Sequence, residues 1–175
     1  KQGEWLDRGI IRQPESILRA VDVVFIALHG SYGEDGEVQK IIQRLGIPFT
    51  GSRSFASAIA FNKQMTKETL KDYGVLMPNH REVSNDPEIN FQEISDEIKS
   101  NFGPEYIIKP VASGSSFGVE FVNENESLAE ALARAVLQYD KVLVEEYIHG
   151  REATSATLED FRNEDIYVFP SIEIV

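Results

Sequence analysis

The feature that most restricts the fold is the apolar run DVVFIALHG, residues 22–30, which a glycine-rich turn follows. A continuous apolar stretch without alternation is typical of a parallel strand buried on both faces. Residues 31–46 predict that turn and then a helix with acids in its first turn, ended by Gly46. Residues 47–51 (IPFTG) predict a second short strand. Strand, helix and strand within about 30 residues form a βαβ unit, so the chain is expected to open as an α/β domain.

The pattern changes after residue 53, where helices and hairpins are expected. Residues 54–74 predict two helices that meet near Asn62, whose side chain can cap the second one, and Gly74 ends it. Residues 75–90 are extended and rich in proline, which indicates a linker. The remaining expected elements are helices over 14–21, 91–103 and 126–138, and strands over 105–112, 118–124, 140–150, 151–160 and 164–175. This part is therefore expected to be α+β.

Composition limits the classes of partner. A net charge of −12 argues against nucleic acid or an anionic membrane as the main partner, because both require a basic surface. No apolar run approaches the ~20 residues of a transmembrane helix. The absence of cysteine excludes disulfides and a thiol nucleophile, and it agrees with a cytoplasmic location. The three histidines, His29, His80 and His149, are widely separated, so no metal site is predicted.

One short motif allows two functions. Gly114–Gly118 (GSSFG) matches the nucleophile elbow of serine hydrolases, which requires a helix directly after the second glycine. Here the following residues alternate as in a strand, and His149 is the one histidine after Ser116. A hairpin is therefore favoured, and its free N–H groups can bind an anion, although a plain turn is the alternative. Two lysines could neutralise that anion: Lys109, at the end of the preceding strand, and Lys63. Alternatively, both could be ordinary surface lysines.

Four segments, taken in order, resemble the D-alanine–D-alanine ligases of the ATP-grasp superfamily: residues 24–52, 57–78, 106–122 and 142–152. The resemblance covers residues 22–158, with Asn62-Lys63 where the family usually has Asp-Lys. It implies a partial ATP-grasp fold of α/β and α+β parts. The expected parts are the end of an N-terminal substrate domain with a parallel sheet (1–53), a central ATP-binding subdomain (54–150) and the start of a C-terminal subdomain (151–175).

The resemblance also implies phosphate contacts. Enzymes of this superfamily phosphorylate a carboxylate with ATP, and an amine then attacks the acylphosphate. Lys63 and Lys109 would contact the α- and β-phosphates. The hairpin 113–118, which begins at Ser113, would close over the transferring phosphate. Within it, Ser115 would act through its side chain as a catalytic residue and Ser116 mainly through its backbone N–H.

The nucleoside contacts implied by the resemblance lie in residues 145–152. Glu145 would receive the adenine amino group, and backbone groups of Glu146, Tyr147 and Ile148 would line the adenine slot. Glu152 would accept the ribose hydroxyls, a role that suits a carboxylate.

His29 and Glu34 match family residues near the first D-alanine, and strand ends are where ligands bind in open α/β sheets. From the residues alone, His29 could equally be structural, and Glu34 could be a helix N-terminal acid. The family's Mg²⁺ ligands and transition-state arginine are expected beyond Val175, so no metal ligand is assigned. The chain, which does not begin with Met, is therefore expected to be an incomplete piece that is inactive alone.

The resulting hypothesis is ATP-dependent ligation of two D-alanines for peptidoglycan precursor synthesis, with D-alanine and ATP as partners and a homodimer as the family's usual state. Two alternatives stay open. One is another ATP-grasp carboxylate–amine ligase, such as a D-alanine–D-lactate or other amino-acid ligase. The other is a nucleotide-binding module that has lost catalysis.

Overall fold

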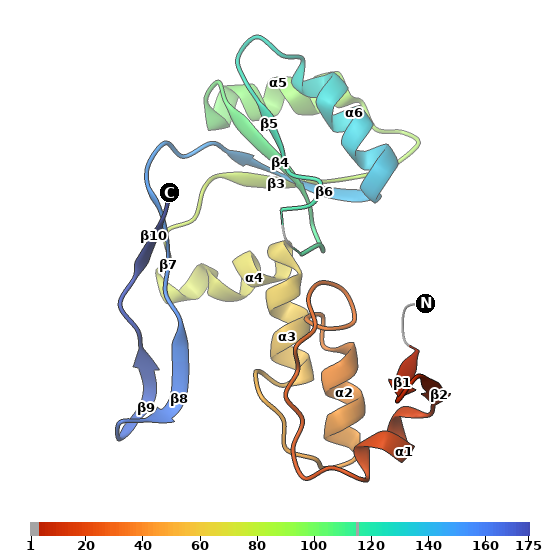
Figure 1. The fold of residues 1–175 in the computed structure, drawn as a ribbon. Helices are drawn as coiled ribbons and strands as arrows, with labels where there is room; N and C mark the ends of the chain where they lie inside the picture. Colours follow the sequence, from red (N-terminus) through yellow and green to blue (C-terminus); the bar gives the residue numbers. More distant parts are fainter. Residues whose placement is uncertain (1–3, 115) are drawn as a thin grey trace.

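A four-stranded antiparallel sheet forms the centre of the upper lobe in Figure 1, with strand order β3–β6–β4–β5. The computed structural model describes residues 4–114 and 116–175. The strands are β3 (His80–Ser84), β4 (Tyr106–Pro110), β5 (Glu120–Val122) and β6 (Lys141–Glu146). Helices α5 (Phe91–Phe102) and α6 (Leu128–Tyr139) both cover one face of this sheet (Figure 1). The opposite face of the sheet, called the open face below, is turned toward the N-terminal part of the chain (Figure 1).

The alternation of side chains along β4 and β6 separates a core from this open face. Tyr106 and Ile108 of β4, with Val142 and Val144 of β6, pack in one buried cluster with α5 and α6. The intervening side chains therefore point to the open face, and among these Lys109 and Glu145 are charged. The same two strands thus supply both the hydrophobic core and polar groups on the other side.

Two consecutive helices link the sheet to the N-terminal part. Helix α3 spans Ser54–Phe61 and α4 spans Lys63–Leu70, followed by the single turn η1 (Lys71–Tyr73). The side chain of Asn62 accepts a hydrogen bond from the Met65 N–H (3.0 Å), and Gly74 ends the turn with φ of 71°. The predicted pair of helices and its asparagine cap are confirmed.

The N-terminal part contains a small hairpin and two further helices. The hairpin, β1 (Trp5–Asp7) with β2 (Ile10–Arg12), was not predicted. Helix α1 spans Pro14–Leu18 and α2 spans Glu37–Arg44. Leu18, Val38 and Ile42 form a second, smaller buried cluster.

The prediction of a buried strand over 22–30 is wrong. This segment forms one isolated parallel bridge, between Val24 and Phe49, and the Phe25 side chain is 77% exposed. The bridge uses Val24 N–H to Pro48 O (2.9 Å) and Thr50 N–H to Val24 O (3.0 Å). The ladder stops there because the next donor, the Ile26 N–H, bonds to the Thr50 side-chain hydroxyl (3.2 Å). For the same reason the predicted strand over 47–51 is reduced to that bridge.

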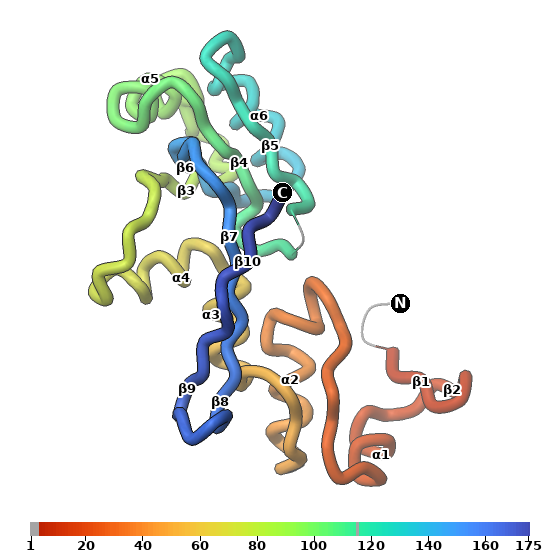
Figure 2. Tube along the Cα trace, turned by 60° about the vertical axis from the view of Figure 1, so that its left-hand side comes forward, coloured from red at the N-terminus to blue at the C-terminus, as the bar shows by residue number. Residues whose placement is uncertain are grey.

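The predicted linker over 75–90 is also wrong in part, since it contains β3, paired with β6. The two strands expected over 151–160 and 164–175 are each divided. They form β7 (Glu152–Thr154), β8 (Thr157–Phe161), β9 (Glu164–Val168) and β10 (Ile172–Ile174). Pairing of β7 with β10 and of β8 with β9 gives a long two-stranded arm that projects away from the sheet (Figures 1 and 2).

Among the residues that the structure describes, no helix has the length and apolar character needed to cross a membrane.

Candidate functional site

A cavity of about 510 Å³ lies on the open face of the four-stranded sheet. Its lining contains nine residues that were predicted to bind the nucleotide: Lys63, Lys109, Ser113, Ser116, Glu145, Glu146, Tyr147, Ile148 and Glu152. Ile107 and Val119 add apolar surface. The predicted site residue Ser115 lies outside the described residues. The structure therefore gathers the predicted set from β4, β6, β7, α4 and the loop 111–119 around one space.

Glu145 is the electrostatic centre of this cavity. Its side chain is 7% exposed, and its Oε1 lies 2.8 Å from the Lys67 Nζ while its Oε2 pairs with Lys109. Burial alone would raise the pKa of Glu145. The ion pairs with Lys109 and Lys67 outweigh burial and hold the pKa of Glu145 below its ordinary value. The carboxylate is therefore kept ionised inside the cavity.

Lys63 fastens the beginning of α4 to the loop that follows β4. Its Nζ donates to the carbonyl oxygens of Pro110 (3.0 Å) and Ser113 (2.9 Å), and its backbone N–H donates to Val111 O (2.9 Å). Burial, followed by repulsion from Lys109, lowers the pKa of Lys63, and the charge of Glu145 opposes this only in part. Because its ammonium is bonded to neutral carbonyls, Lys63 would gain from a nearby anion.

Hydrogen bonds within a few residues of one another join the described residues of the loop 111–119. The Ser113 hydroxyl donates to Phe117 O (3.3 Å), and the Val119 N–H donates to Ser116 O (3.2 Å). Ser116 has φ of 50° and Gly118 has φ of 78°. The loop leads directly into β5, so the helix that a nucleophile elbow requires is replaced by a strand. His149 contacts Glu105 (Nε2 to Oε2, 2.6 Å), and these observations favour the hairpin interpretation over the hydrolase.

The segment after β6 leaves one backbone donor for a ligand. The Glu146 N–H donates to Asn79 O (3.0 Å), and the Tyr147 N–H donates to Glu105 O (2.9 Å). The Glu146 carboxylate accepts from the Asn79 backbone N–H (3.0 Å) and side-chain amide (2.9 Å). In the part of the chain that is described, no hydrogen bond occupies the Ile148 N–H. Of the three backbone groups predicted for the adenine slot, the Ile148 N–H is thus the available donor.

Glu145 was predicted to accept a hydrogen bond from the adenine amino group, but both of its carboxylate oxygens already pair with lysines. Each carboxylate oxygen carries two lone pairs, so an oxygen that already holds a lysine can accept a second hydrogen bond. Glu152, the first residue of β7, is exposed and lines the same cavity.

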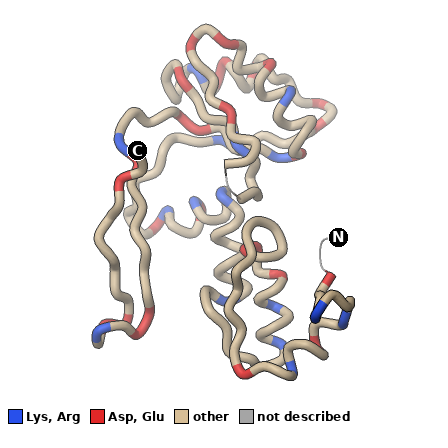
Figure 3. Tube along the Cα trace, in the orientation of Figure 1, with Lys and Arg blue, Asp and Glu red and all other residues tan. Residues whose placement is uncertain are grey.

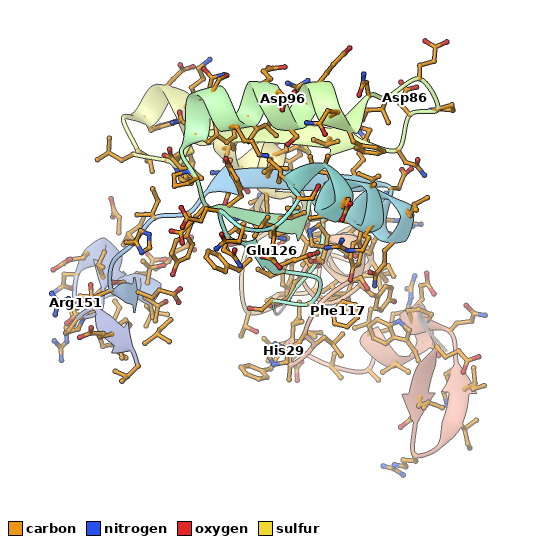
Figure 4. The ribbon with its side chains drawn as sticks, turned by 90° about the horizontal axis from the view of Figure 1, so that it is seen from above. His29, Asp86, Asp96, Phe117, Glu126 and Arg151 are labelled. Carbon is orange, nitrogen blue, oxygen red and sulfur yellow. The ribbon has the colours of Figure 1, made fainter. Side chains whose placement is uncertain are left out.

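A second cavity, of about 290 Å³, adjoins the first, because Lys63 and Ser113 line both. Glu34 lines this smaller cavity, and its Oε2 accepts from the Gly30 N–H (2.6 Å). A Cβ on Gly114 would lie 3.1 Å from the Gly30 Cα, so the loop 111–119 packs closely on the turn after residue 29. Figure 4 labels Phe117 of this loop and His29, the residue before that turn. Glu34 is therefore brought to the predicted phosphate loop.

His29 is placed differently. Its side chain is 94% exposed, and its Nδ1 lies 3.9 Å from the Glu34 Oε1. It lines a separate pocket formed by residues 24–33 and Trp5 rather than either cavity described above.

Sequence reasoning missed several residues of the site, among them Lys67 and Asn79, which contact Glu145 and Glu146. Lys67 lies four residues after Lys63 on α4, and that spacing places both lysines on one helix face. The spacing was a usable signal, although most lysines at such positions are solvated. Asn79 precedes β3, in the segment that had been assigned to a linker. Within residues 4–114 and 116–175, no group of three or more His, Cys, Asp or Glu side chains could hold a metal ion.

Family models match most of the chain. Residues 1–52 match the D-ala D-ala ligase N-terminus, and residues 69–175 match the D-ala D-ala ligase C-terminus. The D-alanine–D-alanine ligase of Carboxydothermus hydrogenoformans is 44% identical over 156 residues, which are 89% of this chain and 49% of that protein. The chain thus spans about half the length of the curated relatives that it matches.

Solved structures agree with these matches. A D-alanine–D-alanine ligase from Bacillus anthracis, complexed with ATP, is 30% identical with a TM-score of 0.75, covering 92% of this chain and 50% of that chain. The VanG D-Ala:D-Ser ligase from Enterococcus faecalis is 32% identical with a TM-score of 0.74, covering 87% and 43% respectively. The expected mixture of α/β and α+β parts in a partial ATP-grasp fold is confirmed. The chain therefore belongs to the D-alanine–D-alanine ligase family.

Proposed function

We propose that the full-length protein joins two D-alanine molecules in an ATP-dependent reaction that supplies a peptidoglycan precursor. The observation that carries this proposal is the joined pair of cavities. One is lined by Lys63, Lys109 and the loop residues Ser113, Ser116 and Val119, and the other shares Lys63 and Ser113 and adds Glu34. A nucleotide in the larger cavity would direct its terminal phosphate toward the place where the substrate carboxylate binds in the smaller one.

The larger cavity has a chemistry that fits ATP. Lys67 and Lys109 pair with the Glu145 carboxylate, and the charge of Glu145 also acts on Lys63, so three lysines lie around one of the lining carboxylates. A bound triphosphate would supply further negative charge to these lysines, and in phosphoryl transfer such cations stabilise the charge that spreads over the transferring group. We assign Lys63 and Lys109 to the phosphates, and Ser113, Ser115 and Ser116 to the loop that closes over them.

Other groups on the same lining suit the nucleoside. The free Ile148 N–H, next to Glu146 and Tyr147, and the apolar side chain of Ile107 can receive a flat base. We assign Glu145 to the exocyclic amine of adenine and Glu152 to the ribose hydroxyls, because both are acceptor groups on the lining.

In the proposed reaction, the carboxylate of the first D-alanine attacks the γ-phosphorus of ATP and ADP leaves. The amine of the second D-alanine then attacks the acylphosphate carbon, phosphate departs and the amine loses a proton. We place His29 and Glu34 near the first D-alanine. We further propose Mg²⁺ as a partner of ATP. Since the described residues contain no metal-ligating cluster, we assign it no ligand and derive no step through it.

The proposal extends to the setting of the protein. We propose a cytoplasmic location, a homodimer, and the three segments 1–53, 54–150 and 151–175 as the substrate domain, the central ATP-binding subdomain and the start of the C-terminal subdomain. These boundaries place the change of segment between α2 and α3, and again between β6 and β7.

A second candidate is a ligase that adds a different second substrate, which the similarity to a D-Ala:D-Ser ligase favours. Phosphate release from ATP by the full-length protein, measured with D-alanine, L-alanine, or D-alanine plus D-serine or D-lactate, separates the two. We expect release with D-alanine alone and formation of D-alanyl-D-alanine by mass spectrometry. Release that requires D-serine or D-lactate would favour the second candidate. If the protein binds ATP but D-alanine does not stimulate phosphate release, both candidates are refuted and the protein is a nucleotide-binding module.

A further inference from the structure

Lys67 is a nearly buried cation in the nucleotide cavity region to which neither the sequence pattern nor the family resemblance gave a role. It lies one turn after Lys63 on α4, on the side of the helix that faces the sheet. Figure 3 shows the basic positions along this helix. Its side chain is 11% exposed, and its Nζ lies 2.8 Å from the Glu145 Oε1. A lysine this deeply buried is rare unless it is paired, so its position requires a carboxylate.

Glu145 joins Lys67 to Lys109. The two lysines approach opposite oxygens of the same carboxylate, one from α4 and one from β4. Lys109 and Glu145 are diagonal neighbours on adjacent strands, since Lys109 pairs with Leu143 and Ile107 pairs with Glu145. With Oε1 occupied by Lys67, the carboxylate is oriented so that Oε2 faces Lys109. The orientation of the Glu145 carboxylate is thus set by Lys67, a residue of helix α4.

Without Lys67, the balance around Glu145 would change. Burial favours the protonated acid, and the ion pair with Lys67 is among the influences that keep the pKa of Glu145 low. A carboxylate with one partner could turn and take Lys109 in both oxygens, away from the cavity. Lys109 would then be less available to an anionic ligand.

We propose that Lys67 is a positioning residue for nucleotide binding: its ion pair orients the Glu145 carboxylate, so that Lys109 can be shared between Glu145 and the phosphates of the nucleotide. This inference rests on the proposed use of the cavity for ATP. Lys67 does not touch the nucleotide in this scheme and acts through Glu145.

A double-mutant cycle in the full-length protein tests the inference, with ATP dissociation constants from calorimetry. We expect Lys67→Met to raise the Kd by about tenfold to a hundredfold, because it leaves a buried charged group without one of its two partners. In a Glu145→Gln background the same change should alter Kd by no more than about twofold, because the carboxylate through which Lys67 acts is gone. Lys67→Arg should keep the Kd near the wild-type value, since it keeps the charge.

Lys71→Met is the matched control, because Lys71 is an exposed lysine one turn further along the chain. It should leave the Kd unchanged. Thermal unfolding of each variant shows that the titrated protein is folded. If Lys67→Met is too unstable to titrate, Lys67→Gln removes the charge while keeping a hydrogen-bond donor and completes the same cycle.

The outcomes separate this inference from the proposed function. If the wild type binds ATP and Lys67→Met binds it equally well, Lys67 is not a positioning residue. An equal loss of affinity in both backgrounds means that Lys67 attracts the nucleotide directly by charge, which also overturns the inference. A wild-type protein that binds no ATP refutes the proposed function, and the inference falls with it.

Discussion

Replacing Gly118 by alanine should both strain the loop 111–119 and push it away from the sheet. Gly118 has φ of 78°, a conformation that an L-residue adopts at a cost. A Cβ at this position would lie 2.5 Å from the Cζ and Oη atoms of Tyr139 and 2.9 Å from the Cγ of Pro110. Tyr139 packs against the core at the end of α6, and Pro110 ends β4, so neither neighbour can move freely.

The expected loss combines two contributions. The left-handed backbone conformation costs about 1–2 kcal/mol for a residue with a Cβ. Overpacking against Tyr139 and Pro110 costs about 1–3 kcal/mol more. The free energy of unfolding should therefore fall by about 2–5 kcal/mol. Since the loop lines the cavity that we propose for the nucleotide, ATP affinity should fall as well.

Two other glycines separate these contributions. Gly46 has φ of 69° with no atom within 4 Å of a built Cβ, so Gly46→Ala measures the backbone contribution alone. Gly150 has open space and no positive φ, so Gly150→Ala should change stability by no more than about 0.5 kcal/mol. Urea unfolding of the full-length protein gives the free energies, and calorimetry gives the ATP affinity. Gly46→Ala should leave ATP affinity unchanged.

The steric part has its own test, because the clash involves ring atoms that a smaller side chain lacks. Tyr139→Leu should recover about 1 kcal/mol or more of the Gly118→Ala loss, seen as a favourable coupling in the double mutant. The reasoning is refuted if Gly118→Ala destabilises no more than Gly46→Ala, or if Tyr139→Leu and Gly118→Ala are strictly additive.

Two further predictions concern the charged and hydroxyl groups of the site. Lys109→Ala should raise the Kd for ATP at least about tenfold. Ser116→Ala should change it by less than about threefold, because Ser116 is expected to act through its backbone N–H. A complete loss of activity in Ser116→Ala with intact ATP binding would instead show a side-chain role. ATP binds best to protonated Lys63, whose pKa is lowered, so affinity should decline as pH rises through a range below that of an ordinary lysine. Lys63→Arg, which stays protonated, should abolish that decline in calorimetric titrations at increasing pH, and an unchanged decline would show that another group titrates.

Local signals in the sequence were sufficient for the helices and for most of the candidate site. The side chain of Asn62, which caps α4, acts within its own turn, so its role follows from neighbouring residues. The apolar run that ends at Lys109 predicted β4, and the strand separates the buried Ile108 from the half-buried Lys109, which lines the cavity. The order of motifs then indicated which residues share the cavity, and the structure brings nine of them together.

The missed elements depend on partners that are distant in the sequence. β3 has the sequence HREVS, in which Val83 alone is apolar, and it becomes a strand because β6 lies beside it. The opposite error occurred over residues 22–30. Their apolar content predicted a buried strand, but their pairing with the segment around Phe49 ends after one bridge. Lys67 was overlooked because its carboxylate lies on β6, which no local pattern connects to α4.

The division of β6 into a core side and a cavity side makes the strand sensitive to changes of length. Deleting one residue within Lys141–Glu146 would exchange the two faces for the residues that follow, since side chains alternate along a strand. Val144 would then point into the nucleotide cavity, and the Glu145 carboxylate would enter the apolar layer under α6, away from both lysines. Point substitutions on the cavity side leave the core intact, but a shift of the β6 register by one residue would disrupt both the core and the cavity.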